Sequence, residues 1–238
     1  PEISASKAHY LAAALDEFKK SGKKVYAVGD YYSQEQYLLA SRADEIYLHD
    51  KGSVVLVGYA AYDGYVKSFL EKILVTPHVF RVGTFKAAVE PFLRDDMSPE
   101  AKEANLAFLG SMWSSYKSSV ESARGLQSGA VDRFSNDFNT VLRESKGDLA
   151  KAALNAGLVD KLANRIEQRK AMVAAFGESD DDAGYKSVDL STYLAAIGAE
   201  KDGKNPNIAI VTAAGTIVDG EATPGTAAGG DTVAANLK

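Results

Sequence analysis

Apolar residues along the chain recur in two spacings, one typical of amphipathic helices and one typical of short buried strands. From Ile3 to Gly22 the apolar positions fall three or four residues apart and predict a helix, with Gly22 as its stop signal. Short apolar runs bounded by turn residues predict strands over residues 25–29, 45–48, 54–57 and 75–82. Lys51 and Gly52 predict a turn between the second and the third of these strands. Strands that alternate with helices indicate an α/β fold with a largely parallel sheet and peripheral helices.

Capping residues mark where further helices begin. Ser33 precedes a helix that leads to the strand over 45–48, and Ser98, Pro99 and Glu100 open a long helix. The apolar stripe of the long helix is predicted to be buried in the core or in a subunit interface, and it consists of Leu106, Leu109, Trp113, Tyr116 and Val120. Other helices are predicted over 65–73, around 134–142, over 149–155, and from the capping box of Asn164 and Glu167 to Gly177.

A polar, glycine-bearing stretch at residues 198–206 has the composition of a linker and divides the chain. Residues 1–197 are predicted to form a first unit, and residues 207–238 to begin a second one with a strand over 207–212. The glycine-rich stretch that leads to Asp231 has no Gly-Lys-Ser, Gly-Lys-Thr or GxGxxG pattern, so we exclude a phosphate-binding loop.

Composition narrows the class of protein. Hydrophobic residues make up 46% of the 238 positions and charged residues 25%, as in an ordinary globular protein. The net charge of −5 and the absence of a basic block argue against a nucleic-acid partner. No apolar run reaches the length of roughly 18 residues that a membrane-spanning helix needs. The absence of cysteine excludes disulfides, thiol nucleophiles and the common zinc-finger arrangements. Pro1 stands where a methionine would begin a chain, so we expect the natural start to lie upstream.

The three histidines are weak candidates for chemistry. No GxSxG or HExxH motif surrounds His9, His49 or His78, and we expect neither a metal site nor a cofactor. His49 and Asp50 are adjacent, and since neighbours on a strand point to opposite faces, we expect no relay between them.

One lysine stands out in the stretch from Arg81 to Glu100. Lys86 lies between small and apolar neighbours, and if this turn packs inward, the loss of water favours the neutral amine that a general base requires. The alternative is a surface lysine, because lysines are almost never fully buried. Asp95 and Asp96 follow downstream; they are more simply explained as loop carboxylates or partners of Arg94 than as paired catalytic acids.

Three strings carry a resemblance to a known family: GTFKAAVEPFLRDDMSPEAKE, KKVYAVGDYYSQEQYLLASRADEIYLHDKG and IAIVTAAGTIVDGE. They resemble signal peptide peptidase A, also called protease IV, in its long form with two tandem repeats. The resemblance implies a Clp protease/crotonase-like repeat with a Ser-Lys dyad, in which the first repeat supplies the lysine and the second repeat the serine. Lys86 would then be the general base, the proton acceptor of the dyad.

The resemblance breaks at one informative turn. Where the catalytic repeat of the family reads Ser-Gly-Gly-Tyr, this chain reads Gln34-Glu35-Gln36-Tyr37. An amide cannot attack a peptide carbonyl, so this repeat is expected to lack a nucleophile; Ser33 is one position early and fits an N-cap better. In family terms, residues 1–197 are the lysine-bearing repeat without its initial strands. Residues 207–238 open the serine-bearing repeat, whose serine and oxyanion hole would lie beyond Lys238.

The resemblance also implies a biological setting. It implies a bacterial inner-membrane enzyme with its catalytic part in the periplasm, an anchor outside this chain, a homotetrameric assembly, and cleaved signal peptides and other extended peptides as substrates. A different class of function stays open, a crotonase-like binding or assembly module that has lost its chemistry.

Overall fold

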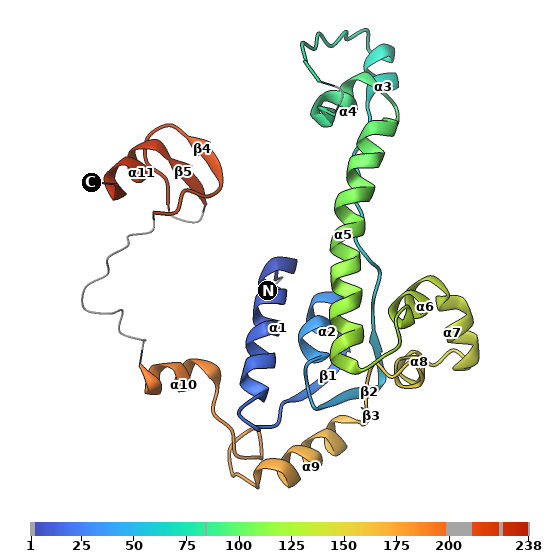
Figure 1. Cartoon of the computed structure of the whole chain (residues 1–238), viewed down its shortest axis with the longest axis vertical. Helices are drawn as coiled ribbons and strands as arrows, with labels where there is room; N and C mark the ends of the chain where they lie inside the picture. Colours follow the sequence, from blue (N-terminus) through green and yellow to red (C-terminus); the bar gives the residue numbers. More distant parts are fainter. Residues whose placement is uncertain (1–2, 84, 199–210, 224–225, 238) are drawn as a thin grey trace. The chain divides into compact units, whose positions relative to one another are not determined.

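The computed structural model describes residues 3–83, 85–198, 211–223 and 226–237. The chain divides into two compact units, Pro1–Lys186 and Ser187–Lys238. Figure 1 shows the elements of each unit. The predicted division into a first repeat (1–197), a linker (198–206) and the start of a second repeat (207–238) stays a prediction.

A three-stranded parallel sheet forms the centre of the first unit. Its strands β1 (Tyr26–Tyr32), β2 (Glu45–Val54) and β3 (Lys161–Leu162) are hydrogen-bonded in the order β1-β2-β3. Helix α2 (Gln34–Ala40) joins the first two strands, which is the connection that parallel neighbours require. The predicted α/β fold with a parallel sheet and peripheral helices is therefore confirmed.

The predicted turn at Lys51 and Gly52, followed by a separate strand over 54–57, is wrong. Strand β2 continues to Val54, and its pairing with β1 shifts from Gly29↔Leu48 to Tyr31↔Ser53. The sheet therefore absorbs the extra residues of β2 as a bulge rather than ending the strand. Only glycine fits at position 52, because a Cβ there would clash with the carbonyl oxygen of Asp30 and approach Leu48 Cδ1 to 2.8 Å.

Helices cover the sheet, and three of them begin at predicted caps. Those of the first unit's body are α1 (Ala5–Lys19), α5 (Pro99–Arg124), α6 (Ala130–Asn136), α7 (Phe138–Glu144), α8 (Leu149–Asn155) and α9 (Arg165–Phe176). The Ser98 hydroxyl accepts a hydrogen bond from Ala101 N at 3.1 Å, and Asn164 and Glu167 form the capping box that opens α9. Helix α2 packs on α1 and α5, and α8 packs on β2. The helix starts predicted at Ser33, Ser98 and Asn164 are confirmed.

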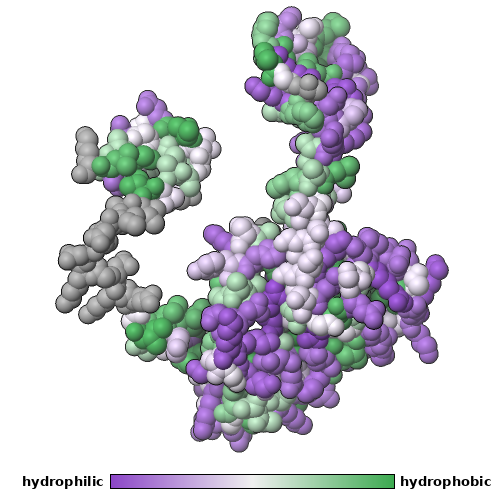
Figure 2. Space-filling view, in the orientation of Figure 1, coloured by the Kyte–Doolittle hydropathy of each residue, from purple (hydrophilic) through white to green (hydrophobic). Residues whose placement is uncertain are grey.

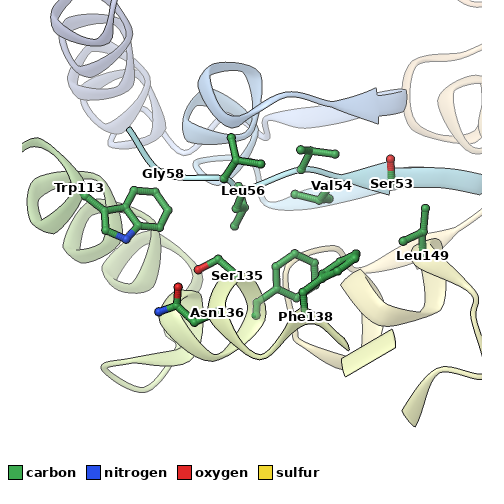
Figure 3. Close-up of a pocket in the computed structure, with 12 residues that line it drawn as sticks. Ser53, Val54, Leu56, Gly58, Trp113, Ser135, Asn136, Phe138 and Leu149 are labelled. Atoms are coloured by element: carbon green, nitrogen blue, oxygen red, sulfur yellow. The ribbon is translucent and has the colours of Figure 1, made fainter. Parts of the chain in front are cut away.

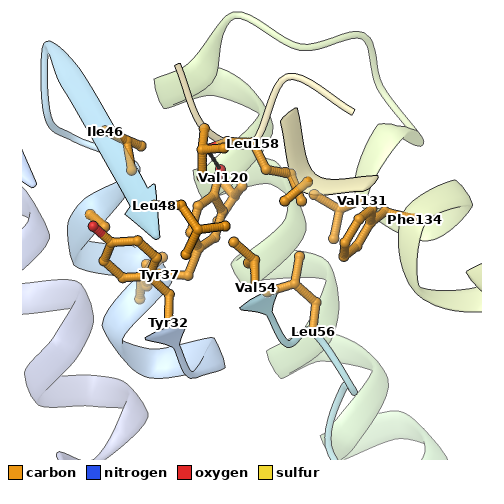
Figure 4. Packing of buried hydrophobic residues seen from close by; sticks show 14 of the residues in the cluster. Tyr32, Tyr37, Ile46, Leu48, Val54, Leu56, Val120, Val131, Phe134 and Leu158 are labelled. Carbon is orange, nitrogen blue, oxygen red and sulfur yellow. Dashed lines mark hydrogen bonds between the residues drawn. The ribbon is translucent and has the colours of Figure 1, made fainter. Parts of the chain in front are cut away.

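The hydrophobic core lies between the sheet and the second half of α5. It joins Tyr37 of α2, Leu48 of β2 and Val120 of α5 to the segments after α5 and α8 (Figure 4). The predicted buried stripe of the long helix holds only in this half, because Tyr116 and Val120 are fully buried whereas Leu106 is 73% exposed. The first half of α5 stands away from the sheet (Figure 1).

A second cluster of short helices lies at the beginning of α5. It comprises α3 (Lys67–Lys72), the 3₁₀ helix η1 (Ala87–Val89) and α4 (Glu90–Leu93). We call this part of the first unit the arm. The arm consists of these helices, the loops between them and the first half of α5. The predicted strand over residues 75–82 is wrong, because this segment has no strand partner and Phe80 is 98% exposed. The sheet that could have paired with it lies at the other end of α5 (Figure 1).

The second unit is small. It contains α10 (Leu190–Ile197), the parallel strands β4 (Thr216–Val218) and β5 (Ala227–Gly229), and α11 (Gly230–Asn236). Of the strand predicted over 207–212, residues 207–210 lie outside the described part, and residues 211–212 are not in a strand.

Candidate active site

The turn between β1 and α2 is the position at which the resemblance places a nucleophile. Ser33 is the N-cap of α2: its Oγ accepts a hydrogen bond from Gln36 N at 3.3 Å, and Gln36 Oε1 accepts one from Ser33 N at 2.9 Å. This reciprocal pair is a capping box. The prediction that Ser33 caps the helix is confirmed.

Gln34 is buried at this turn, with 5% of its surface exposed. Its Oε1 accepts hydrogen bonds from Val57 N at 3.1 Å and Gly58 N at 2.8 Å, and its Nε2 donates to the Gly58 carbonyl at 3.3 Å. The side-chain amide thus pairs with a backbone segment as another peptide group would. The position expected for a nucleophile therefore holds a neutral amide whose hydrogen-bonding groups are already engaged.

Aromatic side chains fix the same turn from the side of α5. The Tyr116 hydroxyl donates to the Gln34 carbonyl at 2.8 Å, and its ring stacks on Trp113 with the ring centroids 5.2 Å apart. Tyr59 meets Trp113 edge to face at 6.3 Å. Burial raises the pKa of Tyr116 well above its ordinary value, so the hydroxyl stays protonated and remains a donor. The Tyr116 hydroxyl thus joins the turn to α5.

An apolar pocket of about 520 Å³ opens beside the backbone segment that binds Gln34 (Figure 3). Its lining comprises residues 53–58, Trp113, Phe134, Ser135, Asn136, Phe138 and Leu149. None of these side chains is an acid, a base or a histidine. The pocket can accept apolar groups, but its walls carry no proton-transfer chemistry.

Lys86 lies elsewhere in the first unit, on the arm. It is exposed and occupies the N-cap position of η1, and Arg81 Nη1 donates to its backbone oxygen at 2.9 Å. The side chain of Lys86 runs past Gly83, whose φ of +106° favours glycine, with Lys86 Cγ 3.8 Å from where a Cβ would stand. In this chain the turn does not pack inward, so the condition for a desolvated lysine is not met by the chain itself.

Lys86 and the turn at Gln34 are not brought together. The helices on either side of Lys86, α3 and α4, lie at the beginning of α5, whereas α2 packs against its second half (Figure 1). The first unit therefore separates the candidate base from the position where the resemblance expects a nucleophile.

The two acids after Lys86 have structural partners. Asp95 accepts hydrogen bonds from Ser68 N at 2.8 Å and Ser68 Oγ at 2.6 Å, which fastens the beginning of α3. Asp96 pairs with Arg94 at 2.9 Å, as predicted for a loop carboxylate.

The expectation that His49 and Asp50 point apart is wrong. His49 Nδ1 lies 3.1 Å from Asp50 Oδ1, because both residues sit in the bulge of β2, where the alternation of a regular strand is lost. The same nitrogen accepts a hydrogen bond from Lys51 N at 3.1 Å, so it offers its lone pair to a backbone amide rather than a proton to a relay. In the described ranges no three His, Asp or Glu side chains gather as metal ligands.

The burial of two polar side chains, Gln34 and Glu90, was not predicted from the sequence. Nothing in the string SQEQY distinguishes the buried Gln34 from the exposed Gln36, because both follow a serine cap. Glu90 is only 2% exposed, and its single hint is its place between Val89 and Pro91 in an apolar run.

The sequence of this chain is similar to that of known proteins. The model of peptidase family S49 matches residues 17–174. The chain is 42% identical over 229 residues to Protease 4 of Salmonella typhi, and 41% identical over 231 residues to Protease 4 of Haemophilus influenzae. Each match covers 96% of this chain and 36% or 37% of the relative.

A more distant relative is the chloroplastic serine protease SPPA of Arabidopsis thaliana, 26% identical over 218 residues, which are 88% of this chain and 30% of the relative. The chain thus spans little more than a third of the length of the two Protease 4 relatives. Since the family model covers well over half of the chain, this protein belongs to peptidase family S49.

Proposed function

We propose that this chain is the lysine-bearing part of a longer serine peptidase that cleaves peptides with a Ser-Lys dyad. The observation that carries the proposal is the placement of Lys86, exposed on the arm of a family S49 chain whose expected nucleophile position holds the engaged amide of Gln34. The names of the relatives, Protease 4 and serine protease SPPA, support the reaction class.

In this proposal the serine comes from a segment outside the chain. The neutral amine of Lys86 takes the proton of the serine hydroxyl, the serine oxygen attacks the substrate carbonyl, and backbone amides bind the oxyanion. Loss of water favours the neutral form of a lysine amine. The exposed side chains of Phe80, Val82 and Phe85 would supply apolar surroundings once the serine-bearing segment covers the arm.

We extend the proposal to the biological setting implied by the resemblance. The substrates are cleaved signal peptides and other extended peptides, and the enzyme is a homotetramer at the bacterial inner membrane with its catalytic part in the periplasm. The proposal includes a membrane anchor outside this chain. Within the described residues, no helix is both long and apolar enough to cross a bilayer.

One observation favours the alternative of a non-catalytic binding or assembly module. The Gln34 amide fills its own site with hydrogen bonds to the backbone of Val57 and Gly58, which is what a repeat without chemistry would retain. This alternative and the peptidase proposal predict different results for the same variant.

The test is Lys86→Ala in the full-length protein, assayed on a peptide ester and a peptide amide. General-base catalysis contributes about a hundredfold to ten-thousandfold to the rate of a reaction. Turnover should therefore fall by about that factor, while the melting temperature stays unchanged. Lys67→Ala is the matched control, because Lys67 also lies on the arm but pairs with Glu71 at 3.0 Å. Near-normal turnover of Lys86→Ala would refute the assignment of Lys86 as general base. The non-catalytic binding or assembly module would then be the remaining proposal for this chain.

A second experiment uses the 238-residue chain alone with a fluorophosphonate probe. We expect no labelling, because Ser33 is the cap of α2, whereas Lys86 lies between α3 and α4 at the other end of α5 (Figure 1). Stoichiometric labelling of Ser33 would mean that the first unit is self-sufficient.

A further inference from the structure

Glu90 is a buried carboxylate on the arm. It is 2% exposed, although glutamates are almost never buried unless they are paired. Its Oε2 accepts a hydrogen bond from Ser98 N at 3.1 Å, and Ser98 is the N-cap of α5. Hydrogen bonds from the side chain and the backbone of Ser98 hold the pKa of Glu90 below its usual value. Glu90 is therefore a carboxylate at neutral pH and is fastened to the beginning of α5.

Arg81 connects this carboxylate to the residue proposed as the base. Its Nη1 lies 3.9 Å from Glu90 Oε1 and donates a hydrogen bond to the backbone oxygen of Lys86 at 2.9 Å. At 3.9 Å the contact with Glu90 is an ion pair without a hydrogen bond, whereas the contact with the Lys86 oxygen is a hydrogen bond. The contacts form a continuous chain from Ser98 through Glu90 and Arg81 to the backbone of Lys86.

In the described part of the arm, apolar packing does not hold the loop that carries Arg81 and Lys86. Phe80 is 98% exposed, Val82 85% and Phe85 62%. Figure 2 shows apolar surface open to solvent among polar residues at the end of α5 that carries α3 and α4. The conformation of the loop therefore depends on its polar contacts, of which the hydrogen bond from Arg81 reaches Lys86 directly.

We propose that Arg81 and Glu90 are positioning residues that hold Lys86 at the geometry required for proton transfer. The inference rests on the proposed function, since it assigns Lys86 the role of the base. Neither residue takes part in proton transfer itself. Glu90 orients the guanidinium of Arg81, and Arg81 fixes the backbone from which the Lys86 side chain extends. A displacement of about 1 Å in such a group can cost a hundredfold in rate.

The test compares Arg81→Ala and Glu90→Gln with the parent and with Lys67→Ala in the full-length protein, on a peptide ester. Glu90→Gln keeps the shape of the side chain and removes its charge. Both variants should lower kcat about tenfold to a hundredfold and leave KM within about twofold, because the loop orients the base without contacting substrate. Lys67→Ala should retain the parent kcat.

A double-mutant cycle separates positioning from general damage to the fold. If Arg81 acts through Lys86, adding Arg81→Ala to Lys86→Ala should leave the residual rate unchanged within about twofold. A further drop equal to that of Arg81→Ala alone would show that Arg81 acts independently of Lys86 and would overturn the proposal.

Hydrogen exchange gives a readout that does not depend on activity. Amides of residues 82, 83 and 85–89 should exchange faster in Arg81→Ala, whereas those of β1 and β2 should be unchanged. Unchanged exchange at these amides would contradict the role of Arg81. If Lys86→Ala is inactive while Arg81→Ala and Glu90→Gln keep the parent rates, the positioning role fails and the dyad stands; an active Lys86→Ala removes the dyad itself.

Discussion

Replacing Gln34 with alanine removes the side chain that joins the beginning of α2 to the backbone of residues 57 and 58. The variant loses three hydrogen bonds and leaves the N–H groups of Val57 and Gly58 without their acceptor. An unsatisfied buried donor costs about 1–3 kcal/mol. Since the bonds are part-buried and the pocket in Figure 3 adjoins the two residues, water can replace some of the lost contacts, and we expect a loss of about 2–3 kcal/mol in total.

The assay is urea unfolding of the 238-residue chain, followed by tryptophan fluorescence. Trp113 is the only tryptophan and lies on the pocket beside Gly58, so it reports on the first unit. Thermal unfolding should show a drop of about 5–10 °C, given roughly 2–4 °C per kcal/mol for a unit of this size.

Gln36→Ala is the matched control for this prediction. Gln36 is exposed and its side chain accepts one capping hydrogen bond from Ser33 N, so its loss should cost about 0.5–1 kcal/mol. Equal losses for Gln34→Ala and Gln36→Ala would refute the reasoning, because they would mean that the amide pairing of Gln34 with the backbone contributes no more than an exposed cap.

Three further predictions concern the first unit. Gly52→Ala should destabilise it by about 1–3 kcal/mol in urea titrations, because a Cβ would clash with the Asp30 carbonyl, whereas Gly110→Ala, in open space on α5, should be neutral or stabilising. Glu121→Ala should cost about 1–3 kcal/mol by the same measurement, because Glu121 Oε1 accepts from two amides at the beginning of α6, each at 3.0 Å; a loss under about 0.5 kcal/mol would contradict this role. A hydrogen bond from Val25 N and the nearby Lys19 lower the pKa of Asp44, so its contribution to stability is complete above the unfolded pKa of about 3.9 and is lost as the pH falls through the lowered folded value. Urea midpoints measured from pH 7 to pH 2.5 should therefore fall less steeply in acid for Asp44→Asn than for the parent, and parallel curves would refute this assignment.

Local signals in the sequence determined where three helices of this protein begin. Ser33 with Gln36, Ser98 with Ala101, and Asn164 with Glu167 bond within three residues, so the chain needs no distant partner to begin a helix there. The alternation of strands and helices gave the parallel α/β class for the same reason, since βα connections are short. The motif around Lys86 likewise pointed to the family before any geometry was known.

Contacts between distant segments decided the rest. Strand β2 runs through Lys51 and Gly52 because β1 pairs with it on both sides of the bulge, and residues 75–82 form no strand because no sheet edge lies near them. The glutamines Gln34 and Gln36 differ in burial for the same reason. Gln34 is buried because it bonds to backbone groups 23 and 24 residues away, whereas Gln36 is exposed to solvent. The sequence alone could not assign the burial of Glu90 either, because its partner Ser98 lies eight residues further on, and the loop between α4 and α5 must bring the two together. A cap depends on a few neighbouring dihedral angles, whereas the burial of a polar side chain depends on which distant backbone group arrives to satisfy it.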